Sequence, residues 1–353
     1  MDKLHLLVVV LILLLGACSN QPKKLVYHTT TEQKLWPQAP DEPRFVFVGQ
    51  LTGENNFYAL APEKNYLKKF AFWLVGLVAG EIEIELLHRP QTGIVDGDGR
   101  VYVSDVGRRG LVVFDPIKGR LQVWQQATAM KTFITPIGVV KIGNDLFVAD
   151  ADLAMVVRLN NKGEPQASIG YGQLERPTGL AFDETSQHLY VADSKSHQIK
   201  IFNLAGDLVD TIGQKGSHAG EFNGPTFITI ANQQLYVADS LNARIQILDL
   251  GGKPIRQFGR RGKYIGDMPQ PKGLAVDANG LIYVIESFFD HILVFNQKGE
   301  FLLPIGGHGQ QAGLFNHPSG VWTGKNNLIY VADMMNSRVQ SFQYLNKQQN
   351  EGM

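Results

Sequence analysis

The sequence predicts an all-β fold, a six-bladed β-propeller of four-stranded blades, from three observations. A phrase of an aromatic residue, valine, a small residue and an acid occurs six times with little variation, as in Tyr236–Asp239. The acids of neighbouring copies lie 43 to 47 residues apart, a period typical of propellers and solenoids. A proline precedes each copy, and short apolar runs separated by turn residues fill each period. The six acids are Asp105, Asp150, Asp193, Asp239, Glu286 and Asp333.

The third repeat shows how one period divides into strands. Residues 179–182, 189–192, 199–202 and 208–212 are short apolar or alternating segments, and turn residues such as Gly206 separate them. Apolar residues at helical spacing are absent from this repeat. Four strands in each of six repeats predict a ring of six blades.

The fourth repeat carries the longest pattern, in which Tyr-Val-Ala-Asp is followed by Asn242, Arg244 and Gln246. Together with a Pro-x-Gly-Leu-Ala phrase, this pattern resembles the NHL repeat over residues 88–344. The resemblance implies a six-bladed propeller. The departures from the family pattern are Arg108 and Gly110 in the first repeat, Phe227 in the fourth, and Glu286 and His291 in the fifth.

The two ends of the repeat region are expected to close the ring. An open ring would expose unpaired strand edges, which invite aggregation. The sixth repeat stops one strand short, at Tyr344, whereas residues 44–49 have the character of the last strand of a repeat. We therefore expect residues 44–49 to complete the sixth blade, so that the propeller covers residues 44–344 and residues 345–353 form a polar tail.

The N-terminus has the features of an exported, lipid-anchored protein. Residues 1–17 contain an apolar run that is too short to span a bilayer and fits a signal peptide. Leu15-Gly-Ala-Cys18 resembles the bacterial lipobox, which implies cleavage before Cys18 and attachment of lipid to it. An ordinary signal peptide ending near a cysteine is the alternative. Ser19 implies sorting to the outer membrane where the organism has two membranes, so we expect a cell-envelope protein.

Residues 18–43 are predicted to be a tether. The segment from Ser19 to Pro43 is polar and contains four spaced prolines, which favour extended chain over compact folding. We interpret it as a semi-rigid spacer between lipid and propeller, with simple disorder as the alternative.

Composition limits the possible partners and cofactors. The chain has 33 Lys+Arg and 33 Asp+Glu, so it lacks the basic surplus that nucleic-acid binding requires, and we expect no nucleic-acid partner. Cys18 is the only cysteine, which excludes an internal disulfide and a thiolate metal site. Histidines occupy no equivalent positions in different repeats, and the predicted innermost strands are nearly all apolar. We therefore expect no metal and no cofactor.

The insertion at residues 57–88 is the main irregularity of the repeat region. It contains an eleven-residue apolar run from Phe70 to Gly80, too short to span a bilayer. One interpretation is a helix or loop packed on one mouth of the propeller. The other is an exposed element that contacts lipid or a partner, with Phe72, Trp73 and Leu77 as the candidate contact residues.

The residues that follow the repeat prolines are expected to form a polar ring at the mouth of the channel. This ring is the default site for a small ligand, and a solvated funnel without a ligand is the alternative. The six repeated acids, by contrast, cannot converge on one atom, so we interpret them as groups that stabilise turns. The predicted ring consists of Thr92, Ile137, Thr178, Thr226, Lys272 and Ser319.

These observations favour a non-catalytic binding or scaffolding propeller, anchored in the cell envelope, that presents one face to a protein or polymer partner. The alternative is an envelope lyase or hydrolase that acts at the channel mouth. Propellers host both kinds of function, so the fold alone does not decide between them.

Overall fold

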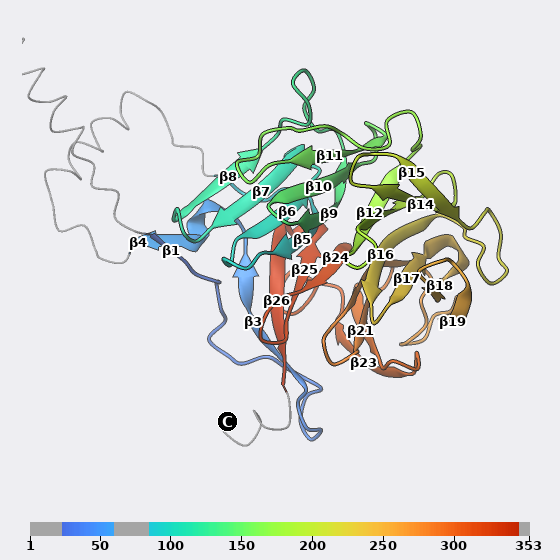
Figure 1. Ribbon diagram of the computed structural model, residues 1–353. Coiled ribbons are helices and arrows are strands. Elements are labelled where there is room, and N and C mark those ends of the chain that lie inside the picture. The colour runs from blue at the N-terminus through green and yellow to red at the C-terminus, as the bar shows by residue number, and fades with distance from the viewer. Residues whose placement is uncertain (1–22, 60–84, 346–353) are drawn as a thin grey trace, which may run out of the picture.

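The computed structural model describes residues 23–59 and 85–345, which form a ring of six antiparallel sheets (Figure 1). Each blade begins with an inner strand that lies beside the inner strands of its two neighbours around a central channel. The six blades confirm the fold predicted from the repeat. In chain order their strands are β5 (Pro90–Val95), β6 (Val101–Asp105), β7 (Gly110–Asp115), β8 (Arg120–Trp124); β9 (Pro136–Ile142), β10 (Asp145–Asp150), β11 (Met155–Leu159); β12 (Pro177–Asp183), β13 (His188–Asp193), β14 (Gln198–Asn203), β15 (Leu208–Ile212); β16 (Pro225–Ala231), β17 (Gln234–Asp239), β18 (Arg244–Asp249), β19 (Pro254–Phe258); β20 (Pro271–Val276), β21 (Ile282–Glu286), β22 (His291–Phe295), β23 (Phe301–Gly306); β24 (Pro318–Thr323), β25 (Leu328–Asp333) and β26 (Arg338–Tyr344).

The two ends of the strands define two faces of the ring. Every inner strand starts at its repeat proline, and the turn between the second and third strands of each blade lies at the same end. We call this end the proline face, and the other end the opposite face. The proline face is defined by Pro90, Pro136, Pro177, Pro225, Pro271 and Pro318.

The sixth blade closes the ring with β3 (Phe45–Leu51), which pairs with β26 from Leu51↔Val339 to Phe45↔Tyr344 (Figure 1). Phe45 is fully buried and shares an apolar cluster with Phe342 of the sixth blade and Tyr283 of the fifth. The predicted closure by the N-terminal strand agrees with this pairing. Because the last strand comes from the start of the chain, the two ends of the domain stabilise each other.

The second blade has three strands where four were expected. Residues 165–169 lie in the place of its outer strand but join β11 only through the bridges Leu159↔Pro165 and Val156↔Ile169. Pro165 has no backbone N–H to donate, which weakens a regular ladder at that point.

The described part of the predicted tether lies on the propeller instead of extending away from it. β1 (Lys23–Leu25) pairs with β4 (Phe57–Ala59), and β2 (Leu35–Trp36) pairs with β3. The Trp36 ring contacts Phe342 edge-on at 5.5 Å between ring centroids. Burial of these apolar side chains outweighs the preference of the spaced prolines for free extended chain.

Several predicted features lie outside the described residues: the signal peptide, Cys18, the polar tail from residue 346, and Phe72, Trp73 and Leu77 of the insertion. The two ends of the insertion are described. Phe57 stacks on Phe114 at 6.4 Å, and Leu87 is 1% exposed. The helices among the described residues are three single turns (η1 Glu54–Asn56, η2 Ser240–Asn242, η3 Met334–Asn336), none of them long or apolar enough to cross a bilayer.

Candidate binding site

The repeated acids hold the proline face together. Each is at most 1% exposed, and each accepts a hydrogen bond from the backbone N–H of a residue one or two positions before its repeat proline. Asp105, for example, accepts from the His88 N–H at 2.7 Å and the Arg89 N–H at 3.0 Å. The acids therefore fix the segment that leads into each inner strand, as their interpretation as turn-stabilising groups predicts.

Three of the predicted channel-mouth residues use their hydroxyl groups to join neighbouring blades. Thr178 Oγ1 donates to the Thr226 carbonyl at 2.8 Å, and Ser319 Oγ donates to the Gln91 carbonyl at 2.5 Å. Thr226 Oγ1 donates to the Lys272 carbonyl of blade five at 3.4 Å and also shares a hydrogen bond with Ser240 Oγ of its own blade at 2.7 Å. These hydroxyls already have partners within the chain, so ligand binding by them stays a prediction that would require exchange of these bonds.

Lys272 is different from these residues because its ammonium has no hydrogen bond or ion pair among the residues that the structure describes. Lys272 is half-buried, and burial of its ammonium lowers its pKa to about 8. Lys272 is therefore the charged member of the predicted ring, and its ammonium has no partner among the described residues.

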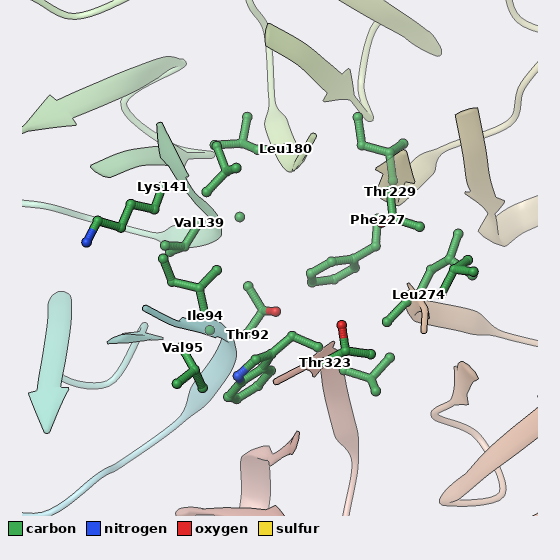
Figure 2. Close-up of a pocket in the computed structure, with 18 residues that line it drawn as sticks. Thr92, Ile94, Val95, Val139, Lys141, Leu180, Phe227, Thr229, Leu274 and Thr323 are labelled. Carbon is green, nitrogen blue, oxygen red and sulfur yellow. The ribbon is translucent and has the colours of Figure 1, made fainter. Parts of the chain in front are cut away.

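Phe227 narrows the channel next to this lysine. It occupies a position at which four of the other repeats carry glycine and the first carries Thr92, and it packs with Ile137 of the second blade's inner strand. Figure 2 shows its ring pointing toward the middle of the cavity. The sequence marked this position as a departure from the repeat but did not indicate that the ring would project into the channel.

A cavity of about 340 Å³ occupies the channel, bounded by the six inner strands (Figure 2). Its walls are mainly aliphatic, including Ile94, Leu180 and Leu274, and Thr92 of the predicted ring also lines it. Lys141 borders the cavity, but its ammonium turns away and pairs with Asp96 at 3.0 Å. Although most of the lining side chains are aliphatic, polar and apolar atoms contribute about equally to the accessible surface of the cavity.

Metal-binding chemistry has no visible basis in the described part of the chain. No group of three or more His, Asp, Glu or Cys side chains within residues 23–59 and 85–345 lies close enough together to hold a metal ion. His308 and His218 each contact one acid, Asp290 at 2.6 Å and Glu221 at 2.9 Å.

Comparisons with known proteins agree with this architecture. Residues 174–202 match the NHL repeat, and residues 269–349 match a family described as a 6-bladed beta-propeller. No curated protein matches the chain in sequence.

Many solved structures share the fold. A streptogramin B lyase aligns with a TM-score of 0.56 and 13% identity, covering 73% of this chain and 94% of the lyase. Virginiamycin B lyase from Staphylococcus aureus aligns with a TM-score of 0.53 and 13% identity over 93% of this chain and 97% of the lyase. A protein of unknown function from Bacteroides thetaiotaomicron aligns with a TM-score of 0.58 and 14% identity over 75% and 71% of the two chains. At these identities the likeness concerns the fold alone. The chain is therefore a six-bladed β-propeller that contains the NHL repeat.

Proposed function

We propose that this protein is a lipid-anchored propeller of the cell envelope that acts as a non-catalytic binding or scaffolding module for a protein or polymer partner. The observation that carries the proposal is the distribution of exposed apolar side chains over the two faces. Large exposed apolar residues are typical of interaction surfaces when they gather on one side of a soluble domain.

The proline face carries most of these side chains. In the turns between second and third strands, Leu241, Phe288 and Met335 are 58%, 66% and 54% exposed. In the described turns of the opposite face, Ile117 is the only large apolar residue exposed to this extent. Further exposed apolar residues in the segments leading into the inner strands are Leu86, Met130, Ile134, Tyr171, Tyr264 and Ile265.

The start of the described chain supports an orientation with the proline face directed away from lipid. Lys23 packs on Gly119, where an added Cβ would lie 2.7 Å from the Lys23 carbonyl oxygen, and Gly119 lies in a turn of the opposite face. Lys23 lies five positions after Cys18 in the sequence, a distance of at most roughly 18 Å in extended chain. A lipid on Cys18 would therefore keep this edge of the first blade close to the bilayer and leave the proline face free for a partner.

Cross-linking in intact cells tests this proposal. We expect a variant with Leu241→Ser, Phe288→Ser and Met335→Ser to fold and to lose the partner that the wild type captures, because its apolar contact area is removed. Ile117→Ser, an equally exposed apolar residue on the opposite face, is the matched control and should keep the partner. If both variants capture the partner as the wild type does, the proline face is not the binding surface.

The alternative function, an envelope lyase or hydrolase acting at the channel mouth, is favoured by one observation. Lys272 lies near the start of inner strand β20 without a partner among the described residues, and a lysine whose pKa is lowered to about 8 by burial has the properties of a catalytic base. Incubation with streptogramin B, the compound for which the similar lyases are named, gives a direct test. The binding proposal predicts no turnover, whereas turnover that Lys272→Met abolishes would establish the enzyme.

A further inference from the structure

Blades four and six contain a buried arginine that links the repeated acid to the segment before the inner strand. In blade four, Arg244 Nε donates to Asp239 at 2.8 Å. Its two terminal nitrogens donate to the carbonyls of Ser217, His218 and Glu221 at 2.7 to 2.9 Å. The guanidinium group thus fills the space between acid and segment with charged hydrogen bonds.

Blade six repeats this arrangement. Arg338 Nε donates to Asp333 at 2.7 Å, and Nη2 donates to the Gln311 and Leu314 carbonyls, both at 2.9 Å. The same arrangement in blades four and six shows that the space between the repeated acid and the segment before the inner strand accommodates a guanidinium group.

Blade five lacks the arginine although its second and third strands pair in the same register. Strand pairing places His291 opposite Glu286, where Arg244 faces Asp239 in blade four, and Leu293 takes the place of Gln246. The segment before the inner strand also keeps its fold, because the Asp267 N–H bonds the Tyr264 carbonyl at 3.0 Å as the Glu221 N–H bonds the His218 carbonyl at 3.1 Å. Because histidine is shorter than arginine, its presence at this position leaves space between Glu286 and the segment before the inner strand.

A cavity of about 130 Å³ lies at this place. Its lining includes Lys263, Tyr264 and Asp267, the counterparts of the residues whose carbonyls bind Arg244 in blade four. Glu286 and His291 line it from the blade. Open space and residues at the acceptor positions of blade four are thus both present in blade five without an arginine.

Glu286 lacks a positive partner. Its side chain is 1% exposed and accepts backbone N–H groups of Gln270, Phe288 and Phe289, but no cation within the described residues pairs with it. Burial raises the pKa of Glu286 and lowers the pKa of His291, so the histidine is mainly neutral near pH 7 and does not replace the missing charge. A cation entering the cavity would therefore relieve an unfavourable buried charge.

We propose that the blade-five cavity binds the guanidinium group of an arginine side chain carried by a partner polypeptide. The partner's arginine takes the place that Arg244 and Arg338 occupy in their own blades. Its guanidinium group forms an ion pair with Glu286 and donates hydrogen bonds to the carbonyls of residues 263–267. A planar fork with five donors fits several converging oxygens better than the point charge of a lysine does.

The rim of the cavity suits a polypeptide ligand. Tyr264 and Ile265 are each 68% exposed and Phe288 is 66% exposed, and all three lie on the proline face. Apolar residues that flank the arginine in the partner would cover them. The inference rests on the proposed binding role of this face and assigns it an arginine-containing segment as ligand.

Titration of the purified, lipid-free propeller with the blocked peptide acetyl-Leu-Arg-Leu-amide tests the inference. The control peptide carries citrulline, which has the same shape without the charge. We expect the arginine peptide to bind about tenfold more tightly or better, as a charged hydrogen-bonded pair implies. His291→Arg fills the cavity from within, and we expect it to melt no lower than the wild type and to lose binding at least tenfold.

Two further variants keep the test decisive if His291→Arg folds poorly. Glu286→Gln should weaken the arginine peptide and not the citrulline peptide, whereas Asp98→Asn, which removes an exposed acid from the opposite face, should change neither. Equal binding of the two peptides, no binding at millimolar concentration, or full binding by a folded His291→Arg variant would each overturn the inference. None of these results would alter the cross-linking test of the proline face, so the two proposals fail separately.

Discussion

Replacement of Lys272 by methionine should stabilise the propeller at neutral pH. Burial lowers the pKa of Lys272 from its ordinary 10.5 to about 8, which means that folding transfers its charge into a poorly hydrated place. A difference of about 2.5 pKa units corresponds to roughly 3 kcal/mol at about 1.4 kcal/mol per unit. Because part of the side chain still reaches solvent, we expect a gain of about 1–3 kcal/mol in the free energy of unfolding.

The sign of the pH dependence follows from the direction of the shift. Below pH 8 the lysine is charged in the folded and the unfolded state, so the folded protein bears the whole cost of burial. Between pH 8 and 10.5 the unfolded state binds more protons, so the stability of the wild type rises with pH relative to the variant. Above pH 10.5 the difference between the two proteins should be small.

Urea unfolding of the wild type, Lys272→Met and Lys162→Met between pH 6 and 10.5 measures this dependence. Lys162 is an exposed lysine in a turn and serves as the control for loss of one positive charge. A stability difference that does not change with pH, or a Lys272→Met variant that is less stable than the wild type at pH 7, would refute the reasoning. An anionic ligand that pairs with Lys272 at the channel mouth would offset the free-energy cost of burying the lysine charge.

Three more predictions concern the termini and the insertion. Cys18→Ser should release the protein from membranes or leave its precursor unprocessed, and a processed variant that fractionates wholly with membranes would contradict the lipid anchor. Deletion of residues 44–49 removes most of β3, exposes the edge of β26 and should cost more than about 3 kcal/mol or cause aggregation; cooperative melting at the wild-type temperature would exclude this closure. Replacement of Phe72, Trp73 and Leu77 by serine should leave the ring folded and abolish partner capture, whereas unfolding of this variant would identify the insertion as a structural plug.

The repeat made the fold predictable because each blade encodes the same four segments and the same turns. The closing strand was predictable for a related reason: the sixth repeat lacks a strand, and residues 44–49 supply one. The attachment of residues 23–36 was not predictable from local composition. Proline content indicates extended chain, but whether the chain is free depends on partners such as Phe342 that lie about 300 positions away in the sequence.

The predicted channel-mouth residues lie on the inner strands, but the partners of their side chains could not be predicted from the sequence. Sequence position brings Thr178, Thr226 and Ser319 to the inner strands, yet their hydroxyl groups bond backbone carbonyls of neighbouring repeats, which no single repeat reveals. Lys272 stands out only when the structure shows that nothing described pairs with it. Two departures from the repeat, Glu286 and His291, mark the blade-five cavity in the sequence. That they leave a cavity becomes clear only from comparison with the contacts of Arg244 in blade four.

The departures from the repeat are the features that give this ring a specific binding surface. Residues shared by all six blades produce six equivalent environments, and equivalent environments cannot distinguish one position of a ligand from five others. Phe227, Lys272 and the Glu286–His291 pair break this equivalence, and all of them lie in blades four and five, on strands that are neighbours around the ring. Phe227 and Lys272 modify the channel, whereas Glu286 and His291 open a cavity beneath the proline face. A ligand that reaches both places would contact the two adjacent blades in one orientation only, which is the physical requirement for specific recognition on a pseudo-symmetric ring.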